Sequence, residues 1–125
     1  MNNELRGVVV CHGTISKALV EATEEIAGVG GALIPVSNSG CGRDDLEARI
    51  ADAVAEQPAV VFVDMASGSC LMAVLRRLRE RPNIGVVTGV NLAMLLDFVF
   101  HRELDPDAAA ARAAQIGGQA IKVPA

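Results

Sequence analysis

Apolar residues fall into two kinds of segment that alternate along the chain. Four short segments are almost continuously apolar and rich in β-branched residues, namely residues 8–11, 32–36, 59–63 and 84–87. A continuous apolar run of this length, unlike an alternating one, is typical of a strand that is buried on both faces of a sheet. These segments therefore predict the strands of a mainly parallel sheet whose two faces are covered.

The segments between these strands carry apolar residues at the spacing of one helix face, three or four positions apart. Four amphipathic helices are predicted on this basis. Their apolar stripes are Ile15, Ala18, Leu19, Ala22 and Ile26 in the first, Leu46, Ile50 and Val54 in the second, Leu71, Leu75 and Leu78 in the third, and Leu92, Leu95, Leu96 and Val99 in the fourth.

The last part of the chain predicts a fifth helix and a short strand. Residues 106–117 are rich in alanine and begin with Pro106, which suits the first turn of a helix. Gly117 and Gly118 are expected to end this helix. Residues 120–123 are apolar enough to form a short C-terminal strand.

The predicted order alternates strand and helix four times, and then adds a helix and the terminal strand. This alternation is typical of an α/β fold, in which helices cover both faces of a parallel sheet through right-handed crossovers. We expect an open, doubly wound sheet with the order 2-1-3-4, in a single domain over residues 1–125. In such sheets, ligands bind beyond the carboxyl ends of the strands, where the order reverses. The longest predicted loop, residues 37–42, follows the second strand and can reach over this edge.

Two residues with useful chemistry follow the first and third predicted strands. His12 ends the first strand, and Asp64 ends the third. With the order 2-1-3-4 these strands are neighbours, so the two side chains are expected to face each other. A neutral imidazole can act as a nucleophile or general base, and a carboxylate can hold it by one nitrogen and leave the other free. The alternative is that His12 is only a polar residue that caps a strand.

Residues 67–69 have the sequence Ser-Gly-Ser and open the third predicted helix. The backbone N–H groups and the dipole at a helix start favour an anion, so this segment predicts a phosphate site. Taken alone, the segment is explained equally well by an ordinary serine N-cap. Together with His12 and Asp64 it favours phosphoryl transfer through histidine. The predicted phosphate-binding residues are Gly13, Thr14, Ser67, Gly68 and Ser69.

Composition narrows the possible functions. The chain has 125 residues, of which 51% are apolar, and its formal net charge is −4. This apolar content is enough for a folded core and is unlike that of disordered proteins. Nucleic-acid-binding domains are usually basic and often stack bases on aromatic side chains, whereas this chain is acidic, lacks Trp and Tyr and has only 3 Phe. We therefore expect no nucleic-acid partner.

The cysteines and the first residues of the chain indicate where in the cell the protein is expected. Cys11, Cys41 and Cys70 are odd in number and widely spaced, which predicts reduced thiols in a cytoplasmic protein rather than a disulfide framework. A metal site built from these thiols and His12 is disfavoured against buried, inert thiols, since no Cys-x-x-Cys pair is present. We expect no signal peptide, and no apolar stretch approaches the roughly 18–20 residues that span a membrane.

Five segments carry a resemblance to a known family. They are the apolar strand that ends in His12-Gly13, the segment Val61-Phe62-Val63-Asp64, the segment Ser67-Gly68-Ser69, the stretch from Val86 to Leu96, and the tail from Gly117 to Val123. Together they resemble the enzyme IIA domain of the mannose-type phosphoenolpyruvate-dependent sugar phosphotransferase system. The resemblance covers nearly the whole chain, and the stretch from Val86 to Leu96 is its most specific part.

The resemblance implies a role for each matching residue. By family precedent, His12 accepts a phosphoryl group on Nε2 from the phosphocarrier protein HPr and passes it to a histidine of a separate IIB component, without a cofactor. Asp64 corresponds to the aspartate that hydrogen-bonds this histidine, and Gly68 and Ser69 correspond to the Gly-Ser pair on the phosphate side. Family members are homodimers that exchange the terminal strand, here residues 120–123, and they meet the membrane only through IIC and IID components.

Three positions depart from the family pattern, and two other functions remain open. Ser67 stands where glycine is usual, Cys70 where proline is usual, and Met72 where asparagine is common. One alternative function is a regulatory module that is phosphorylated on His12 and does not feed sugar uptake. The other is the related phosphocarrier of dihydroxyacetone kinase, against which the Thr-Gly-Val-Asn segment at residues 88–91 argues.

Overall fold

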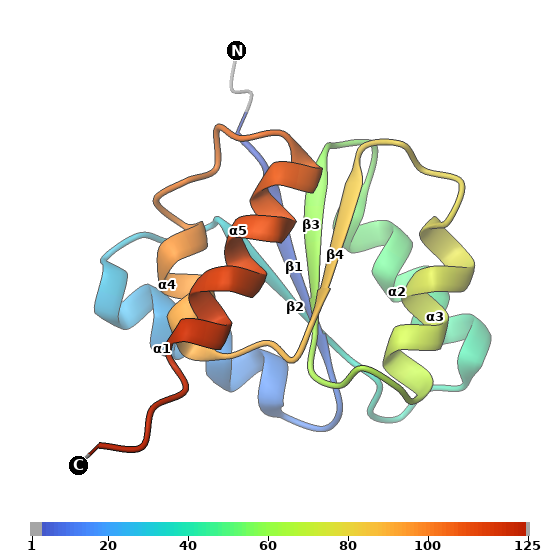
Figure 1. The fold of residues 1–125 in the computed structure, drawn as a ribbon. Helices are drawn as coiled ribbons and strands as arrows, with labels where there is room; N and C mark the ends of the chain where they lie inside the picture. Colours follow the sequence, from blue (N-terminus) through green and yellow to red (C-terminus); the bar gives the residue numbers. More distant parts are fainter. Residues whose placement is uncertain (1–3, 125) are drawn as a thin grey trace.

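The computed structural model describes residues 4–124, and within them all strands belong to one parallel sheet (Figure 1). The strands are β1 (Arg6–Cys11), β2 (Leu33–Ser37), β3 (Ala59–Val63) and β4 (Ile84–Thr88). Their order is β2-β1-β3-β4, which confirms the predicted order. Because β1 pairs with β2 on one side and with β3 on the other, the order reverses between β1 and β3. The carboxyl ends of these two strands lie side by side.

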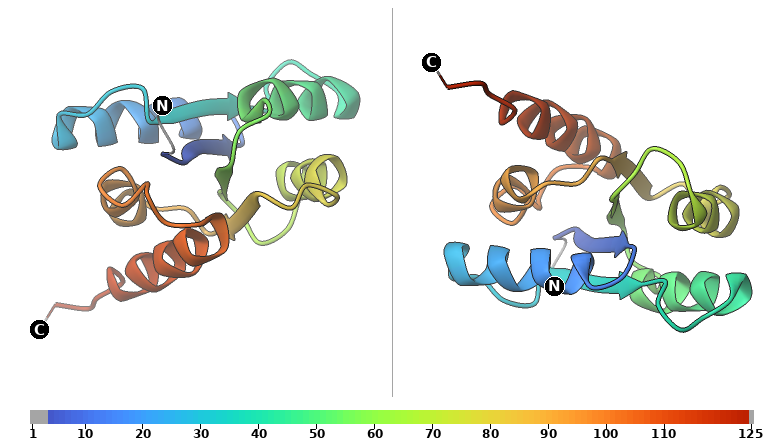
Figure 2. Two further views of the ribbon diagram at one scale, coloured as in Figure 1. Left: turned by 90° about the horizontal axis from the view of Figure 1, so that it is seen from above. Right: turned by 90° about the horizontal axis from the view of Figure 1, so that it is seen from below.

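Helices cover both faces of this sheet. Within the described residues they are α1 (Ile15–Ala27), α2 (Arg43–Val54), α3 (Ser69–Leu78), α4 (Leu92–Phe98) and α5 (Pro106–Gln119). Helices α1, α4 and α5 lie on one face and α2 and α3 on the other, so the domain has three layers (Figure 2). Across residues 4–124, no helix combines the length and the apolar character needed to cross a membrane.

Successive residues of the inner strands point to opposite faces and build two separate cores. Val9 of β1 and Phe62 of β3 belong to the core under α1, α4 and α5. Val10 of β1 belongs to the core under α2 and α3, together with Ile50 and Val74 from those helices. The burial of both faces explains why these strands are continuous apolar runs in the sequence.

The buried face of α1 differs from the predicted one. Its buried residues are Ser16, Val20 and Thr23, whereas Ile15 and Ile26, at the two ends of the predicted stripe, are 46% and 61% exposed. Thr23 can be buried because its hydroxyl donates to the backbone carbonyl four residues earlier, at 2.7 Å. The helix was predicted correctly and its orientation was wrong.

The end of α5 also differs from the prediction. The helix continues through Gly117 and Gly118 to Gln119 instead of ending at the two glycines. Gly117 packs against the start of α4, where a Cβ on it would lie 2.4 Å from Cε of Met94. The side chain of Asn91 donates from Nδ2 to the carbonyl oxygen of Gly117 at 3.0 Å. The close contact between α5 and α4 therefore explains why residue 117 is a glycine.

The predicted terminal strand over residues 120–123 is not formed in the isolated chain. Ala120 is the C-cap of α5, and residues 121–124 have no regular structure. Helix α5 carries this tail away from the sheet, so it has no strand to pair with in its own chain (Figure 1). Ile121 and Val123 are accordingly 78% and 94% exposed.

Candidate functional site

His12 lies at the carboxyl end of β1, beside the carboxylate that follows β3. Val10 pairs with Val63 across these strands, and this register brings Asp64 next to His12. Oδ2 of Asp64 accepts two hydrogen bonds from His12, one from the backbone N–H at 2.9 Å and one from Nδ1 of the ring at 2.8 Å. A carboxylate oxygen can only accept, so Nδ1 carries a proton. In the neutral ring the basic lone pair is therefore on Nε2.

Burial and hydrogen bonding act in opposite directions on Asp64. Burial raises the pKa of its carboxyl group, but the hydrogen bonds from the backbone and ring of His12 lower it by more, so the pKa lies below its ordinary value. Asp64 is therefore a carboxylate at neutral pH. Its second oxygen, Oδ1, is buried and has no hydrogen-bond partner within residues 4–124.

Nε2 of His12 faces the start of α3. Oγ of Ser69 lies 3.5 Å from Nε2, and a Cβ on Gly68 would lie 3.7 Å from the same atom. Gly68 is the N-cap of α3 and has a φ of 100°, a backbone conformation that favours glycine. It offers no side-chain cap, so the N–H groups of the first turn of α3 remain available to an anion.

The end of β2 holds the backbone that follows His12. The N–H of Gly13 donates to Oδ1 of Asn38 at 3.1 Å, and the hydroxyl of Ser37 donates to the carbonyl of Gly13 at 2.6 Å. Gly13 has a φ of 59°, so this turn also favours glycine. No sequence motif pointed to Ser37 or Asn38; their position in the polar loop after the second strand was the only signal.

The remaining predicted phosphate-binding residues are Thr14 and Ser67, and both are exposed. The carbonyl of Thr14 accepts the N–H of Ala18 at the start of α1. Ser67 lies in the loop before α3. Within the described part of the chain, neither side chain hydrogen-bonds to His12. The predicted residues that the structure brings together are His12, Gly13, Asp64, Gly68 and Ser69.

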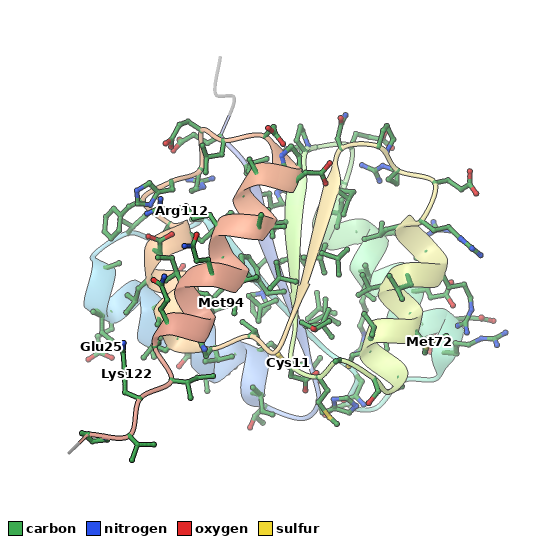
Figure 3. The ribbon with its side chains drawn as sticks, viewed as in Figure 1. Cys11, Glu25, Met72, Met94, Arg112 and Lys122 are labelled. Atoms are coloured by element: carbon green, nitrogen blue, oxygen red, sulfur yellow. The ribbon has the colours of Figure 1, made fainter. Side chains whose placement is uncertain are left out.

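Two buried thiols lie near the site. All three cysteines are free, and Cys11 and Cys70 are buried, whereas Cys41 is partly exposed. Burial, followed by the charge of Asp64, raises the pKa of Cys11 to about 12 and that of Cys70 to about 11. Both thiols are therefore protonated at neutral pH. Figure 3 places Cys11 at the edge of the sheet where the strands end.

A cavity of about 270 Å³ adjoins the site between the starts of α2 and α3. Ser69 lines this cavity and also lies next to His12. Arg43 and Arg76 add positive charge to its wall, although Arg76 is paired with Glu47 at 3.0 Å. The wall also includes Met72, on the outer side of α3 (Figure 3). The site thus combines an oriented nucleophilic nitrogen, a helix start and nearby cations, a combination that suits transfer of an anionic group.

Solved structures of sugar phosphotransferase components share this fold. EIIA from Streptococcus agalactiae superposes with a TM-score of 0.86 at 18% identity, over 95% of this chain and 96% of that one. The mannose/sorbose-specific IIA subunit from Enterococcus faecalis gives a TM-score of 0.83 at 23% identity, over 98% and 96%. A putative phosphotransferase system permease from Klebsiella pneumoniae gives a TM-score of 0.85 at 16% identity, over 98% of this chain and 93% of that one.

The sequence itself matches a family model over most of its length. No curated protein matches the chain. Residues 7–115, however, match the model described as the PTS system fructose IIA component, which covers His12, Asp64 and the start of α3. The predicted resemblance is confirmed. The chain belongs to this mannose-type enzyme IIA family of the phosphotransferase system, a family of phosphoryl-transfer proteins.

Proposed function

We propose that this protein carries a phosphoryl group on Nε2 of His12, receives it from HPr and passes it to a histidine of a separate IIB component for coupled sugar uptake. One observation carries the proposal. Asp64 takes both the backbone N–H and Nδ1 of His12 on a single oxygen, so Nε2 holds the lone pair and faces the start of α3. The family match supports HPr and IIB as partners and a cytoplasmic location.

The transfer needs only groups that the two proteins supply. The lone pair on Nε2 attacks phosphorus, the new N–P bond forms, and the N–P bond to the donor histidine breaks with its electron pair on the donor. Asp64 balances the positive charge that the ring gains while it is phosphorylated. The N–H groups at the start of α3 and the hydroxyl of Ser69 are placed to bind the phosphoryl oxygens. The second transfer reverses these steps with the IIB histidine as nucleophile.

The test is phosphorylation by phosphoenolpyruvate, enzyme I and HPr, measured by intact mass, followed by addition of IIB. Wild-type protein should gain one phosphoryl group that acid removes and alkali does not. His12→Ala should gain none, and His101→Ala is the matched control because it removes the other histidine of the chain. Full labelling of His12→Ala would overturn the proposal. Labelling of the wild type without any transfer to IIB would favour the regulatory module instead.

We also infer that the tail exchanges between two copies of the chain. Strand β4 pairs only with β3 within the described residues, so its outer edge is open. The other edge strand, β2, carries Pro35 in its middle, and proline is poorly suited to receiving another strand. Pairing with the open edge of β4 would cover the exposed, apolar side chains of Ile121 and Val123. A homodimer in which residues 120–123 of each chain add to β4 of the other would cover both features.

A further inference from the structure

One oxygen of Asp64 is left without a partner in the interior. Oδ2 takes both hydrogen bonds from His12, whereas Oδ1 is buried and unpaired within residues 4–124. A buried, ionised oxygen without a partner is costly, and such atoms are rare unless a water or an ion completes them. A group that binds Oδ1 would remove this cost.

Cys70 supplies a further donor close to His12 and Asp64. It lies in the first turn of α3 and is fully buried. Its Sγ, one ring nitrogen of His12 and one carboxylate oxygen of Asp64 all lie within 4.8 Å of one another. In a tetrahedral site with metal–ligand bonds of about 2.0–2.3 Å, donor atoms are about 3–4 Å apart, so small side-chain shifts would close this grouping around one cation.

The donor set identifies the kind of cation. Nitrogen, carboxylate oxygen and thiolate sulfur are the three ligand types that Zn²⁺ uses in proteins, whereas Mg²⁺ and Ca²⁺ take oxygen ligands. Three protein ligands leave one position of a tetrahedral site for water. The spacing of the cysteines along the sequence showed no sign of this site, because the fold brings Cys70 to His12 and Asp64 rather than to another cysteine.

We propose that His12, Asp64 and Cys70 bind a zinc-class divalent cation that competes with phosphorylation of His12. The proposal rests on the proposed function of His12 as phosphoryl acceptor. On binding, the thiol of Cys70 releases its proton to solvent and a metal–sulfur bond forms, with no change of oxidation state. Oδ1 of Asp64 and one nitrogen of His12 each donate a lone pair.

Metal binding and phosphorylation exclude each other because a neutral imidazole has only one basic lone pair. If the cation binds Nε2, the nucleophilic lone pair is occupied. If it binds Nδ1, the ring proton moves to Nε2, and the hydrogen bond from Nδ1 to Asp64 is lost. In both geometries the ring cannot attack phosphorus. Cys70 thereby makes the acceptor histidine responsive to the supply of free zinc.

The first experiment measures metal binding at the proposed site and does not involve phosphoryl transfer. Reduced, tag-free protein is titrated with Co²⁺, and the near-ultraviolet band of a cobalt–thiolate bond is followed together with the visible bands of tetrahedral cobalt. Wild-type protein should reach its end point at one equivalent, and Cys70→Ser should lose the thiolate band. Cys41→Ser is the matched control, because it makes the same substitution at a cysteine outside the grouping, and it should keep the band. Circular dichroism checks that each variant is folded.

The second experiment uses purified phospho-HPr as donor, so that no other enzyme is exposed to the metal. One equivalent of Zn²⁺ should slow phosphorylation of the wild type and of Cys41→Ser at least tenfold, and that of Cys70→Ser less than twofold. An unchanged thiolate band in Cys70→Ser, or no band in the wild type, would overturn the metal site. A cobalt band in a wild type that phospho-HPr never labels would instead overturn the proposed function and leave the site standing.

Discussion

Gly68 lies against the imidazole of His12, and a side chain in its place would occupy the space in front of the ring. A Cβ there would be 3.6 Å from Cε1 and 3.7 Å from Nε2. These are ordinary contact distances in the unphosphorylated protein, but they leave no room for a phosphoryl group on that side of Nε2. The glycine is required both by this space and by its φ of 100°.

Gly68→Ala should therefore reduce phosphoryl transfer from HPr at least tenfold, measured by rapid quench and intact mass. It should also lower the free energy of unfolding by about 1–3 kcal/mol, because a residue with a Cβ is strained at a φ of 100° combined with a ψ of −178°. Gly28→Ala is the control for strain alone, since Gly28 has a φ of 70° at the far end of α1 with nothing within 4 Å of its Cβ position. Equal transfer rates in the two variants would show that the space in front of Nε2 is not used.

Asp64→Asn should fold normally and transfer the phosphoryl group at least tenfold more slowly, which corresponds to about 1.4 kcal/mol of barrier. Asparagine keeps the shape of the side chain but not the charge that balances the phosphorylated ring. Asp45→Asn, at an exposed position in the first turn of α2, is the matched control and should keep the wild-type rate. If Asp64→Asn also keeps the wild-type rate, Asp64 does not take part in the reaction.

The double substitution Ser67→Gly and Cys70→Pro should restore the family pattern of the loop and change transfer by less than about tenfold in the absence of added metal. Anion binding at the start of α3 depends on backbone N–H groups, which Ser67 does not alter from its exposed position. Proline at position 70 fixes the backbone of the first turn and removes one of its N–H groups, while the other N–H groups of that turn remain. A gain of several orders of magnitude would identify the natural protein as an impaired carrier and support a regulatory role.

The ion pair between Asp97 and Arg112 should make stability depend on acid pH. Arg112 donates to both oxygens of Asp97 at 2.8 Å, and these hydrogen bonds hold the pKa of Asp97 below its ordinary value. The folded pKa is thus lower than the unfolded one, near ~3.9. The contribution to stability is present above the unfolded pKa and is lost as the pH falls through the folded pKa.

Asp97→Asn should therefore be less stable than wild type at pH 7 and should lose less stability on acidification below about pH 4. Urea unfolding at a series of pH values between neutral and strongly acidic measures both effects. Asp52→Asn, an exposed position on α2, should follow the wild-type curve. A variant whose acid limb is as steep as that of the wild type would show that Asp97 does not carry this linkage.

Removal of residues 120–125 should convert a dimer into a monomer or cause aggregation, as measured by light scattering. The physical reason is that Ile121 and Val123 then no longer cover the open edge of β4 in a partner chain. Lys122→Ala, which keeps the tail and its apolar residues, is the control. A wild-type protein that is monomeric at micromolar concentration would rule out the exchange.

The sequence alone predicted the sheet and the pair of His12 and Asp64 at the centre of the site. Continuous apolar strands predicted double burial, and strand–helix alternation predicted a parallel sheet covered on both faces. The expected order 2-1-3-4, which the structure confirms, then places His12 beside Asp64. The buried face of α1 was missed because Thr23 is polar yet satisfies its hydroxyl within the helix. The end of α5 was missed because Gly117 serves a contact with Met94 that local sequence does not reveal.

The local sequence pattern also failed to predict two side-chain contacts of the site that depend on the tertiary structure. Asn38 orients Gly13 through a hydrogen bond across the loop, and Cys70 approaches Asp64 only because α3 starts beside the end of β3. Neither relationship follows from spacing along the chain, since each joins elements that become neighbours only in the folded sheet.

Strand β1 pairs with a neighbour on each side, so the number of residues in β1 decides where His12 is placed. Residues 7–11 are held by β2 and residues 6–10 by β3, and His12 follows immediately. One residue inserted into β1 would send each following side chain to the opposite core and turn the histidine away from Asp64. Insertions are therefore expected to be tolerated after residue 38, in the loop before α2, but not between Arg6 and His12. Length variants and circular permutants of this protein should therefore keep the number of residues between Arg6 and His12 unchanged.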